Sequence, residues 1–334
     1  MTTRSLDRRF GIELTPEQPV ETLASLAETA EEAGFDMVFA SHHYNNRDEF
    51  LALAAMAAAT ERIQLGPGVT NPYETNPVTL ASRMATFDEL ADNRGIFGVG
   101  PGDSSTLSNL GIDQERPLRR VLETMQVARD LWAGERVTHD GTFEAVDAGL
   151  NYDARDIPVY VGGQGPHMTR MAAKYADGVL YNGSHPRDIK WAAERVEEGL
   201  ADRPDHRGEF EFAAYASVSV AVDADEARAA ARPPVAFIAA GAPPPVLDRH
   251  DLSTEVSGEI GNAISAGEFT EAFDLVTEPM LDAFAIAGTP ETVEKRVEKL
   301  LEYADSVVFG SPLGPDIEEA ISLMGARLPT IRDE

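Results

Sequence analysis

The chain has 334 residues, of which 43% are hydrophobic and none is cysteine. A sizeable core is therefore possible, whereas disulfides, thiolate catalysis and cysteine-bound metal are excluded. With 57 acidic against 28 basic residues the formal net charge is −29, and such a surface repels nucleic acid and anionic membranes, which both need basic patches. We therefore expect no nucleic acid partner. No run of 18 apolar residues and no secretory leader pattern occurs, so we also expect no membrane partner and a cytoplasmic location.

The acidic residues are spread along the whole chain rather than gathered in a tail, and only four of the basic residues are lysines. Two interpretations stay open. One is an ordinary acidic enzyme. The other is a halophilic protein in a cytoplasm with molar salt, where the Debye length is about 3 Å and self-repulsion is screened. The even distribution favours the halophilic interpretation.

Short apolar strands alternate with longer amphipathic segments from residue 9 onward. The predicted strands are 9–14, 37–41, 63–68, 95–100, 158–163, 178–183, 210–221 and 306–311. The predicted helices are 20–33, 48–60, 77–91, 117–132, 166–176, 187–200, 290–304 and 315–327, and four prolines stand where a first helical turn would begin, namely Pro77, Pro117, Pro166 and Pro315. This alternation indicates a parallel α/β fold, and the count favours a (β/α)₈ TIM barrel over a doubly wound sheet.

A typical barrel of this kind has about 250 residues. The surplus falls mainly at about 223–289, between the seventh and eighth strands, with a smaller insertion at 101–116. No segment has the composition of an interdomain linker. We therefore predict a single barrel domain over residues 1–334 with a helical insertion at about 223–289.

The predicted strands run into glycine, proline or small polar residues at their C-terminal ends, where such barrels place their sites. The first strand ends at Glu13. The next ends carry the segments SHHYNNRD (41–48), GPGVTN (66–71), GVGPGD (98–103), GGQGP (162–166) and NGSHP (182–186). A purely structural barrel does not need this pattern at one rim, whereas backbone that approaches a flat, phosphate-bearing ligand does.

The charged candidates each have two interpretations. Glu13 in an apolar strand is either a salt-bridged core acid or a catalytic carboxylate. His42 and His43 suggest a metal site at first sight. Adjacent strand residues point to opposite faces, however, and no HxxxH or HExxH pattern accompanies them. We therefore expect no metal.

The glycine segments are also ambiguous. GVGPGD resembles a fragment of GxGxxG, but it follows the fourth strand and opens no clear helix, so a Rossmann interpretation is weak. No lysine follows a glycine loop in the manner of a Walker site. GGQGP before a helix is either an anion nest, whose free amides and helix dipole suit a phosphate, or a turn that is glycine-rich for packing reasons.

Eight segments in order across nearly the whole chain carry a resemblance. They are FGIEL, HHYNNRD, LGPGVTNPY, GVGPGD, VYVGGQGP, DGVLYNGSHP, AFIAAGAPPPVLDRH and FGSPLGPD. Together they resemble the F420-dependent methylenetetrahydromethanopterin reductase family, within the luciferase-like group of (β/α)₈ flavin and deazaflavin enzymes. The resemblance implies reversible hydride transfer between reduced coenzyme F420, as cosubstrate, and the methylene group of a pterin, giving the methyl-pterin. It also implies no tightly bound flavin and a homodimer or homotetramer.

The resemblance places functional residues on matching positions. It implies that Glu13 and Asp103 are the catalytic acids and that His43 contacts the coenzyme. The residue before His43 is usually aspartate in that family, and here it is His42, which leaves open which pterin is bound or how the deazaflavin is held. The expected cofactor-binding residues are His43, Gly68, Val69, Thr70, Asn71, Gly100, Gly162, Gly163, Gln164, Gly165, Asn182 and Ser184.

The expected chemistry suits a carboxylic acid. The methylene bridge must open before hydride arrives, and a proton on the departing nitrogen is typically worth about 10²–10⁴-fold. We expect Glu13 to supply it and both carboxylates to favour the iminium cation. Methylene-tetrahydromethanopterin and methylene-tetrahydrofolate both remain open as substrates, because organisms that accumulate salt are generally not methanogens. The sequence is also compatible with an F420-dependent alcohol or sugar dehydrogenase, a flavin monooxygenase and a non-catalytic deazaflavin-binding module.

The resemblance also explains why the third strand stops abruptly in LGPGVTNP. Related enzymes carry a non-prolyl cis peptide in this turn, and the matching bond here is Gly68–Val69. We expect a bulge there that faces the deazaflavin ring, with Thr70 and Asn71 at the polar edge of the ring.

Overall fold

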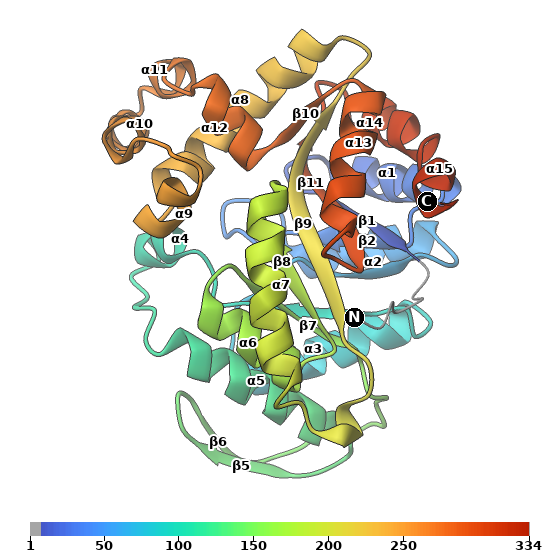
Figure 1. The fold of residues 1–334 in the computed structure, drawn as a ribbon. Coiled ribbons are helices and arrows are strands. Elements are labelled where there is room, and N and C mark those ends of the chain that lie inside the picture. Colours follow the sequence, from blue (N-terminus) through green and yellow to red (C-terminus); the bar gives the residue numbers. More distant parts are fainter. Residues whose placement is uncertain (1–7, 334) are drawn as a thin grey trace. The chain divides into compact units, whose positions relative to one another are not determined.

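The computed structural model describes residues 8–333, and its strands and helices alternate along the chain (Figure 1). All eight predicted strands are present, as β1 Arg9–Glu13, β2 Met37–Ala40, β3 Gln64–Pro67, β4 Phe97–Val99, β7 Val159–Gly163, β8 Gly178–Asn182, β9 Glu211–Val220 and β11 Ser306–Leu313. The sheet has the order β3-β2-β1-β11-β9-β8-β7-β4, and a short ninth strand, β10 Ile286–Gly288, pairs with β9. Parallel bridges Leu65–Gly95 and Thr70–Val99 join β3 to β4, so the sheet curls into a nearly closed barrel.

The eight predicted helices are also present. They are α1 Val20–Glu32, α2 Glu49–Ala59, α3 Pro77–Leu90, α5 Pro117–Trp132, α6 Pro166–Tyr175, α7 Pro186–Leu200, α13 Pro290–Leu301 and α14 Ile317–Gly325. Proline occupies the start of α3, α5 and α6, as predicted. The prediction for Pro315 was wrong, because α14 begins only after Asp316, whose carboxylate accepts the backbone N–H of Glu319 at 2.9 Å.

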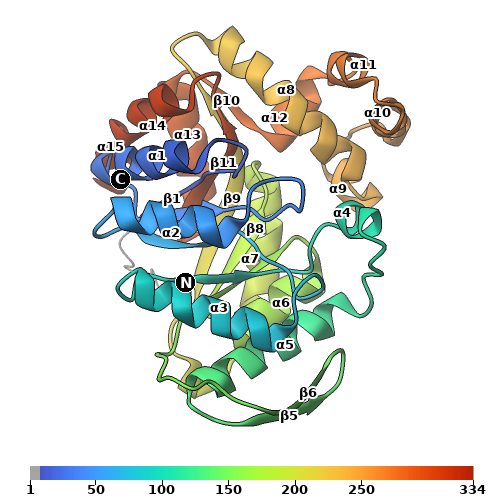
Figure 2. The ribbon, with the colours of Figure 1, turned by 180° about the vertical axis from the view of Figure 1, so that it is seen from behind.

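The described chain divides into two compact units. One contains residues 8–10, Asn182–Trp191 and 214–333, and the other contains Gly11–Tyr181 and Ala192–Ala213. In the second unit, β2 pairs in parallel with β1 and β3, and β7 pairs in parallel with β4 and β8. The core of this unit is made by fully buried side chains of these strands and of the helices outside them, among them Phe39, Phe97, Met37, Leu53 and Met56. Figure 2 shows α1, α2 and α3 side by side along it.

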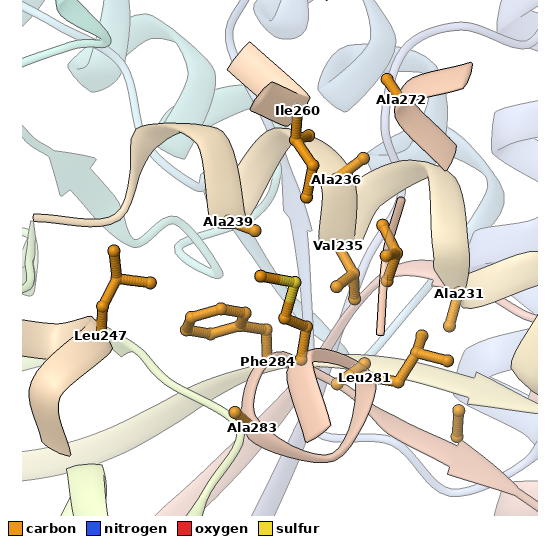
Figure 3. Close-up of a cluster of buried hydrophobic side chains, with 14 of the residues drawn as sticks. Ala231, Val235, Ala236, Ala239, Leu247, Ile260, Ala272, Leu281, Ala283 and Phe284 are labelled. Carbon is orange, nitrogen blue, oxygen red and sulfur yellow. The ribbon is translucent and has the colours of Figure 1, made fainter. Parts of the chain in front are cut away.

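The first unit holds the helices of the predicted insertion. They are α8 Ala224–Gly241, α9 Pro244–Arg249, α10 Thr254–Ala266, α11 Phe269–Asp274 and α12 Glu278–Phe284. Val235, Ala239, Ile260, Leu281 and Phe284 are among the buried side chains that these helices share (Figure 3). The insertion therefore has its own apolar cluster, and the short β10 connects it to α13.

Several short elements were not expected from the sequence. They include α4 Ser104–Asn109, the antiparallel hairpin of β5 Val137–Asp140 and β6 Glu144–Ala148, strand β10, and α15 Leu328–Asp333. Helix α4 corrects one prediction, because GVGPGD does lead directly into a helix. Over residues 8–333 no helix is both long and apolar enough to cross a membrane.

Candidate active site

The first predicted acid lies at the C-terminal end of β1. Glu13 is opposite Phe39 in the parallel β1–β2 pair, and the next residue donates its backbone N–H to the Phe39 carbonyl at 2.8 Å. The side chain of Glu13 is half-buried, and the Thr15 hydroxyl donates a hydrogen bond of 3.1 Å to its Oε1. Glu13 is thus held at the rim of the sheet with its carboxylate oriented by a neighbouring hydroxyl.

The turn after β3 passes very close to β4. A Cβ on Gly66 would lie 1.9 Å from the carbonyl oxygen of Ile96, and one on Gly98 would lie 1.8 Å from that of Pro67. Only glycine permits backbones to approach in this way. The Gly68–Val69 peptide bond is cis, as predicted from the resemblance.

Hydrogen bonds fix this turn on both sides. The Gly68 N–H donates to the Ala40 carbonyl at the end of β2 at 2.8 Å. The Thr70 N–H donates to the Gly98 carbonyl at 3.0 Å, and the Gly100 N–H donates to the Thr70 carbonyl at 2.9 Å. The turn therefore bridges the ends of β2 and β4.

The Val69 side chain packs against glycines at the ends of two further strands. A Cβ on Gly100 would lie 2.6 Å from Val69 Cγ2, and one on Gly162 would lie 2.8 Å from the same atom. Three residues that the sequence nominated separately are thus in direct contact. Any side chain at Gly100 or Gly162 would displace the Val69 side chain.

A charged network joins this turn to the loop after β2. His42 Nδ1 lies 2.8 Å from Glu49 Oε2, and His42 Nε2 lies 3.0 Å from Glu74 Oε1. The Thr70 hydroxyl donates to Glu49 Oε1 at 3.0 Å, and the Asn71 amide donates to Glu74 Oε1 at 2.8 Å. The polar groups of Thr70 and Asn71 are buried in this network, and their expected contact with the ring's edge stays a prediction.

The protonation of this network follows from its contacts. Burial disfavours the charged imidazole, but the hydrogen bonds and charges of Glu49 and Glu74 outweigh it and raise the pKa of His42 to about 9. Burial likewise tends to raise the pKa of Glu49, and the hydrogen bond and charge of His42 lower it below its ordinary value. At neutral pH a histidine cation therefore bridges two carboxylates.

The second predicted acid has a different setting. Asp103 is exposed and caps α4, because its Oδ1 accepts the Thr106 N–H at 2.9 Å. Partial burial tends to raise the pKa of Asp103, but hydrogen bonds from Ser105 and Thr106 and the nearby charge of His43 lower it. Asp103 is thus an ionised hydrogen-bond acceptor near His43, which suits an electrostatic role better than proton donation.

The segment after β7 leads into α6 without a side-chain cap. Gly165 is the N-cap residue and makes no side-chain cap, and Gln164 to Pro166 are exposed. A Cβ on Gly163 would lie 2.6 Å from Met168 Cγ, so this glycine is needed where the loop turns onto the helix. The segment has the backbone amides and the helix dipole that the predicted anion nest requires.

Two of the predicted cofactor-binding residues, Asn182 and Ser184, lie in the first unit. Asn182 ends β8 and is exposed, whereas Ser184 is buried and its Oγ accepts the Ser217 N–H at 2.9 Å. The Ser184 hydroxyl thus helps to hold β9.

The residues that sequence reasoning missed are Glu49 and Glu74. The only signals for them were a glutamate directly after the helix cap Asp48, and another two positions before Asn76 in the second Asn-Pro of its segment.

The chain is similar to known proteins over nearly its whole length. The model of the family described as luciferase-like monooxygenase matches residues 5–308. The 5,10-methylenetetrahydromethanopterin reductase of Archaeoglobus fulgidus is 42% identical over 326 residues, which cover 96% of this chain and 98% of the relative, and the enzyme of the same name from Methanolobus tindarius is 41% identical over 322 residues, 96% of this chain and 99% of the relative. The solved structure of the coenzyme F420-dependent tetrahydromethanopterin reductase of Methanopyrus kandleri superposes with a TM-score of 0.91 at 37% identity, covering 97% of this chain and 99% of that one.

Proposed function

Because the chain belongs to the luciferase-like family, and within it to the 5,10-methylenetetrahydromethanopterin reductases, we propose that it catalyses hydride transfer between reduced coenzyme F420 and a methylene-tetrahydropterin. The relatives match over nearly their whole length, so the proposal does not rest on a shared fragment. Within the fold, the contact of Val69 with Gly100 and Gly162 is the observation that carries it. This contact makes a surface of backbone and one small side chain at the strand ends.

The residues at these strand ends suit coenzyme F420. A flat ring needs such a surface, and the uncapped start of α6 offers amides for a phosphate. With only four lysines in the chain, backbone amides are better candidates than ammonium groups for holding the phosphate. Gly162 to Gly165 would hold the phosphate, while His43 and the Val69 turn would hold the ring. Asn182 and Ser184 stay predicted cofactor-binding residues. The hydride comes from reduced F420 when that coenzyme is bound.

Glu13 would act on the pterin. A proton from a Glu13 carboxyl oxygen goes to the bridging nitrogen, the bond from that nitrogen to the methylene carbon breaks, and the remaining iminium carbon accepts the hydride to become a methyl group. The Thr15 hydroxyl fixes the Glu13 carboxyl for this step. Asp103, ionised and near His43, stabilises the cationic carbon electrostatically.

The experiment is direct. Purified protein in molar KCl is mixed with reduced F420 and either methylene-tetrahydromethanopterin or methylene-tetrahydrofolate, and the deazaflavin absorbance is followed. We expect reoxidation of F420 with one of the two pterins, and the faster one identifies the substrate. Turnover only with a secondary alcohol or a sugar phosphate, or F420 binding without any turnover, would refute the proposal in favour of a dehydrogenase or a binding module.

The last part of the proposal concerns the salt dependence, location and oligomeric state of the protein. We infer that the protein is halophilic, because a chain with a net charge of −29 repels itself strongly unless salt screens the charge. From the family resemblance we also infer a homodimer or homotetramer, and we infer a cytoplasmic location. Sedimentation in molar KCl measures the oligomer. Melting temperature measured against KCl tests the salt dependence, and a curve that stays flat from low to molar salt would contradict it.

A further inference from the structure

His42 contacts acidic residues from two segments of the chain. Glu49 opens α2, and Glu74 lies in the loop between β3 and α3. The imidazole contacts both carboxylates, one through each ring nitrogen, at 2.8 Å and 3.0 Å. The exposed fractions of the side chains are 19% for His42, 2% for Glu49 and 18% for Glu74, so all three charges are largely removed from water.

The same two carboxylates hold the turn that follows the Gly68–Val69 bond. Thr70 donates to Glu49, and Asn71 donates to Glu74. Asn71 also accepts the N–H groups of Tyr73 and Glu74 at 3.0 Å and 3.1 Å. Both residues next to Val69 on its C-terminal side are therefore tied, through one carboxylate each, to the His42 ring.

The charge balance requires a cation at this position. Without a proton on His42, Glu49 and Glu74 would be two carboxylates converging on a neutral ring, and a buried carboxylate without a counter-charge is strongly unfavourable. The raised pKa of His42 agrees with this geometry. The other charged groups around the network are Asp48 at the start of α2, His43 with Asp103, and Arg120, which donates to the Pro72 carbonyl at 2.7 Å and 2.9 Å and lies over the Tyr73 ring.

We propose that His42 is a positioning residue for coenzyme binding: its cation draws Glu49 and Glu74 together, and these fix Thr70 and Asn71 so that the Val69 turn keeps the shape that the deazaflavin ring requires. The proposal rests on the proposed function for the identity of the ligand. It predicts that losing the cation weakens coenzyme binding more than it slows the chemical step, because both ring nitrogens of His42 are engaged by Glu49 and Glu74.

The test uses the full chain in molar KCl and oxidised F420 as the probe. The Kd is measured from quenching of F420 fluorescence, alongside KM and kcat with the methylene-pterin. We expect His42→Gln, a neutral side chain, to raise both the Kd and the KM for F420 about tenfold or more, with a smaller change in kcat. His42→Lys keeps the cation and should recover part of the affinity.

Arg155→Gln is the matched control. Arg155 pairs with the buried Asp88 at the opposite, N-terminal end of the strands, at 2.6 Å and 2.7 Å. Its loss should lower the melting temperature and leave the Kd for F420 unchanged. If His42→Gln behaves in the same way, with a lower melting temperature and an unchanged Kd, the positioning role is refuted.

Two further measurements keep the outcome clear. If the His42 variants do not fold, the ring proton of His42 is titrated by NMR in the wild-type protein, and titration near the ordinary 6.5 instead of about 9 would overturn the proposal. A wild-type protein that binds F420 but turns over no methylene-pterin would refute the proposed function alone. The effect of His42→Gln on the Kd would still decide the positioning role.

Discussion

The two ends of the same strands in the second unit are secured in opposite ways. Before β3, β4 and β7, a carboxylate accepts backbone N–H groups and pairs with an arginine. Glu31 accepts from Arg62 and Ile63 at 2.6 Å and 2.7 Å, and Asp88 accepts from Gly95 at 2.8 Å while Arg155 holds it. Asp177 accepts from Val159 at 2.8 Å while Arg129 donates to it at 2.6 Å.

The C-terminal ends of these strands carry no such arginine–carboxylate pairs among the contacts described above. Their backbones meet through glycines around Val69, and their charged network is built on one histidine, whose proton can leave in the alkaline range. In barrels of this class the N-terminal face serves stability and the C-terminal face serves the site. The comparison therefore predicts that substitutions at the two ends separate stability from activity.

The largest effect on stability is expected at the N-terminal end. Asp88→Asn removes the charge that Arg155 and the Gly95 N–H share, and Asp88 is only 3% exposed. Breaking a buried ion pair in this way costs about 3 kcal/mol or more. Urea unfolding in molar KCl measures it. Turnover per folded molecule should stay at the wild-type value, and a large fall in kcat at a temperature where the variant is fully folded would contradict the separation of the two ends.

The largest effect on activity is expected at Glu13. Glu13→Gln keeps the shape but removes the proton donor, so kcat should fall by about 10²-fold or more, whereas the melting temperature and the Kd for F420 change little. Stopped-flow absorbance of F420 measures the chemical step. The exposed Glu17, four residues further on, provides the control Glu17→Gln with unchanged kcat. Full turnover by Glu13→Gln would remove Glu13 from the mechanism.

Asp103 allows the two predicted catalytic acids to be compared with each other. Because Asp103 is ionised and caps α4, Asp103→Asn should lower kcat less than Glu13→Gln does and should also weaken that short helix. Measuring kcat for the two variants side by side ranks the acids. A larger fall for Asp103→Asn would exchange their proposed roles.

The packing around Val69 predicts a smaller effect, on binding. A methyl group on Gly100 would lie 2.6 Å from Val69 Cγ2, so Gly100→Ala must displace that side chain. We expect the Kd for F420 to rise about tenfold, with a loss of stability of about 1–3 kcal/mol from overpacking. Gly241→Ala at the end of α8, where a Cβ meets nothing within 4 Å, is the control and should leave the Kd unchanged. An unchanged Kd for Gly100→Ala would show that this surface does not contact the coenzyme.

The sequence predicted one end of the strands much better than the other. Glycine, proline and a polar strand-end residue such as Glu13 are local signals, so the positions of the C-terminal strand ends were predicted correctly. The cis bond was predicted correctly from the family resemblance. Glu31, Asp88 and Asp177 gave no signal, because an acidic residue that accepts a distant N–H group looks like any other surface acid in a chain with 57 of them. Glu49 and Glu74 were missed for the same reason. The segment of Glu74 is brought to His42 by the pairing of β2 with β3, and Glu49 reaches His42 because α2 begins shortly after it.

The last prediction, with the smallest expected effect, concerns pH. At the N-terminal end, burial of Glu31 tends to raise its pKa, but the N–H groups of Ile63, Arg62 and Glu61 lower it below 4.5. Its contribution to the free energy of unfolding is therefore complete above pH 4.5 and is lost as the pH falls through the lowered pKa. At the C-terminal end, the pKa of His42 is raised from 6.5 to about 9, so its contribution is complete below pH 6.5 and is lost as the pH rises through about 9.

Each end should therefore limit stability on its own side of neutrality. Urea unfolding across the pH range at constant molar KCl should show Glu31→Gln with a flatter acid limb and an unchanged alkaline limb, and His42→Gln with a flatter limb between pH 6.5 and about 9. The carboxylates Glu49 and Glu123, whose pKa values are also lowered, contribute to the acid limb and keep it from vanishing in Glu31→Gln. If the free energies of unfolding of His42→Gln and wild type stay parallel above pH 6.5, His42 is not protonated in the folded protein in that range. The C-terminal ends would then lack the charged histidine network that distinguishes them from the N-terminal ends with their arginine–carboxylate pairs.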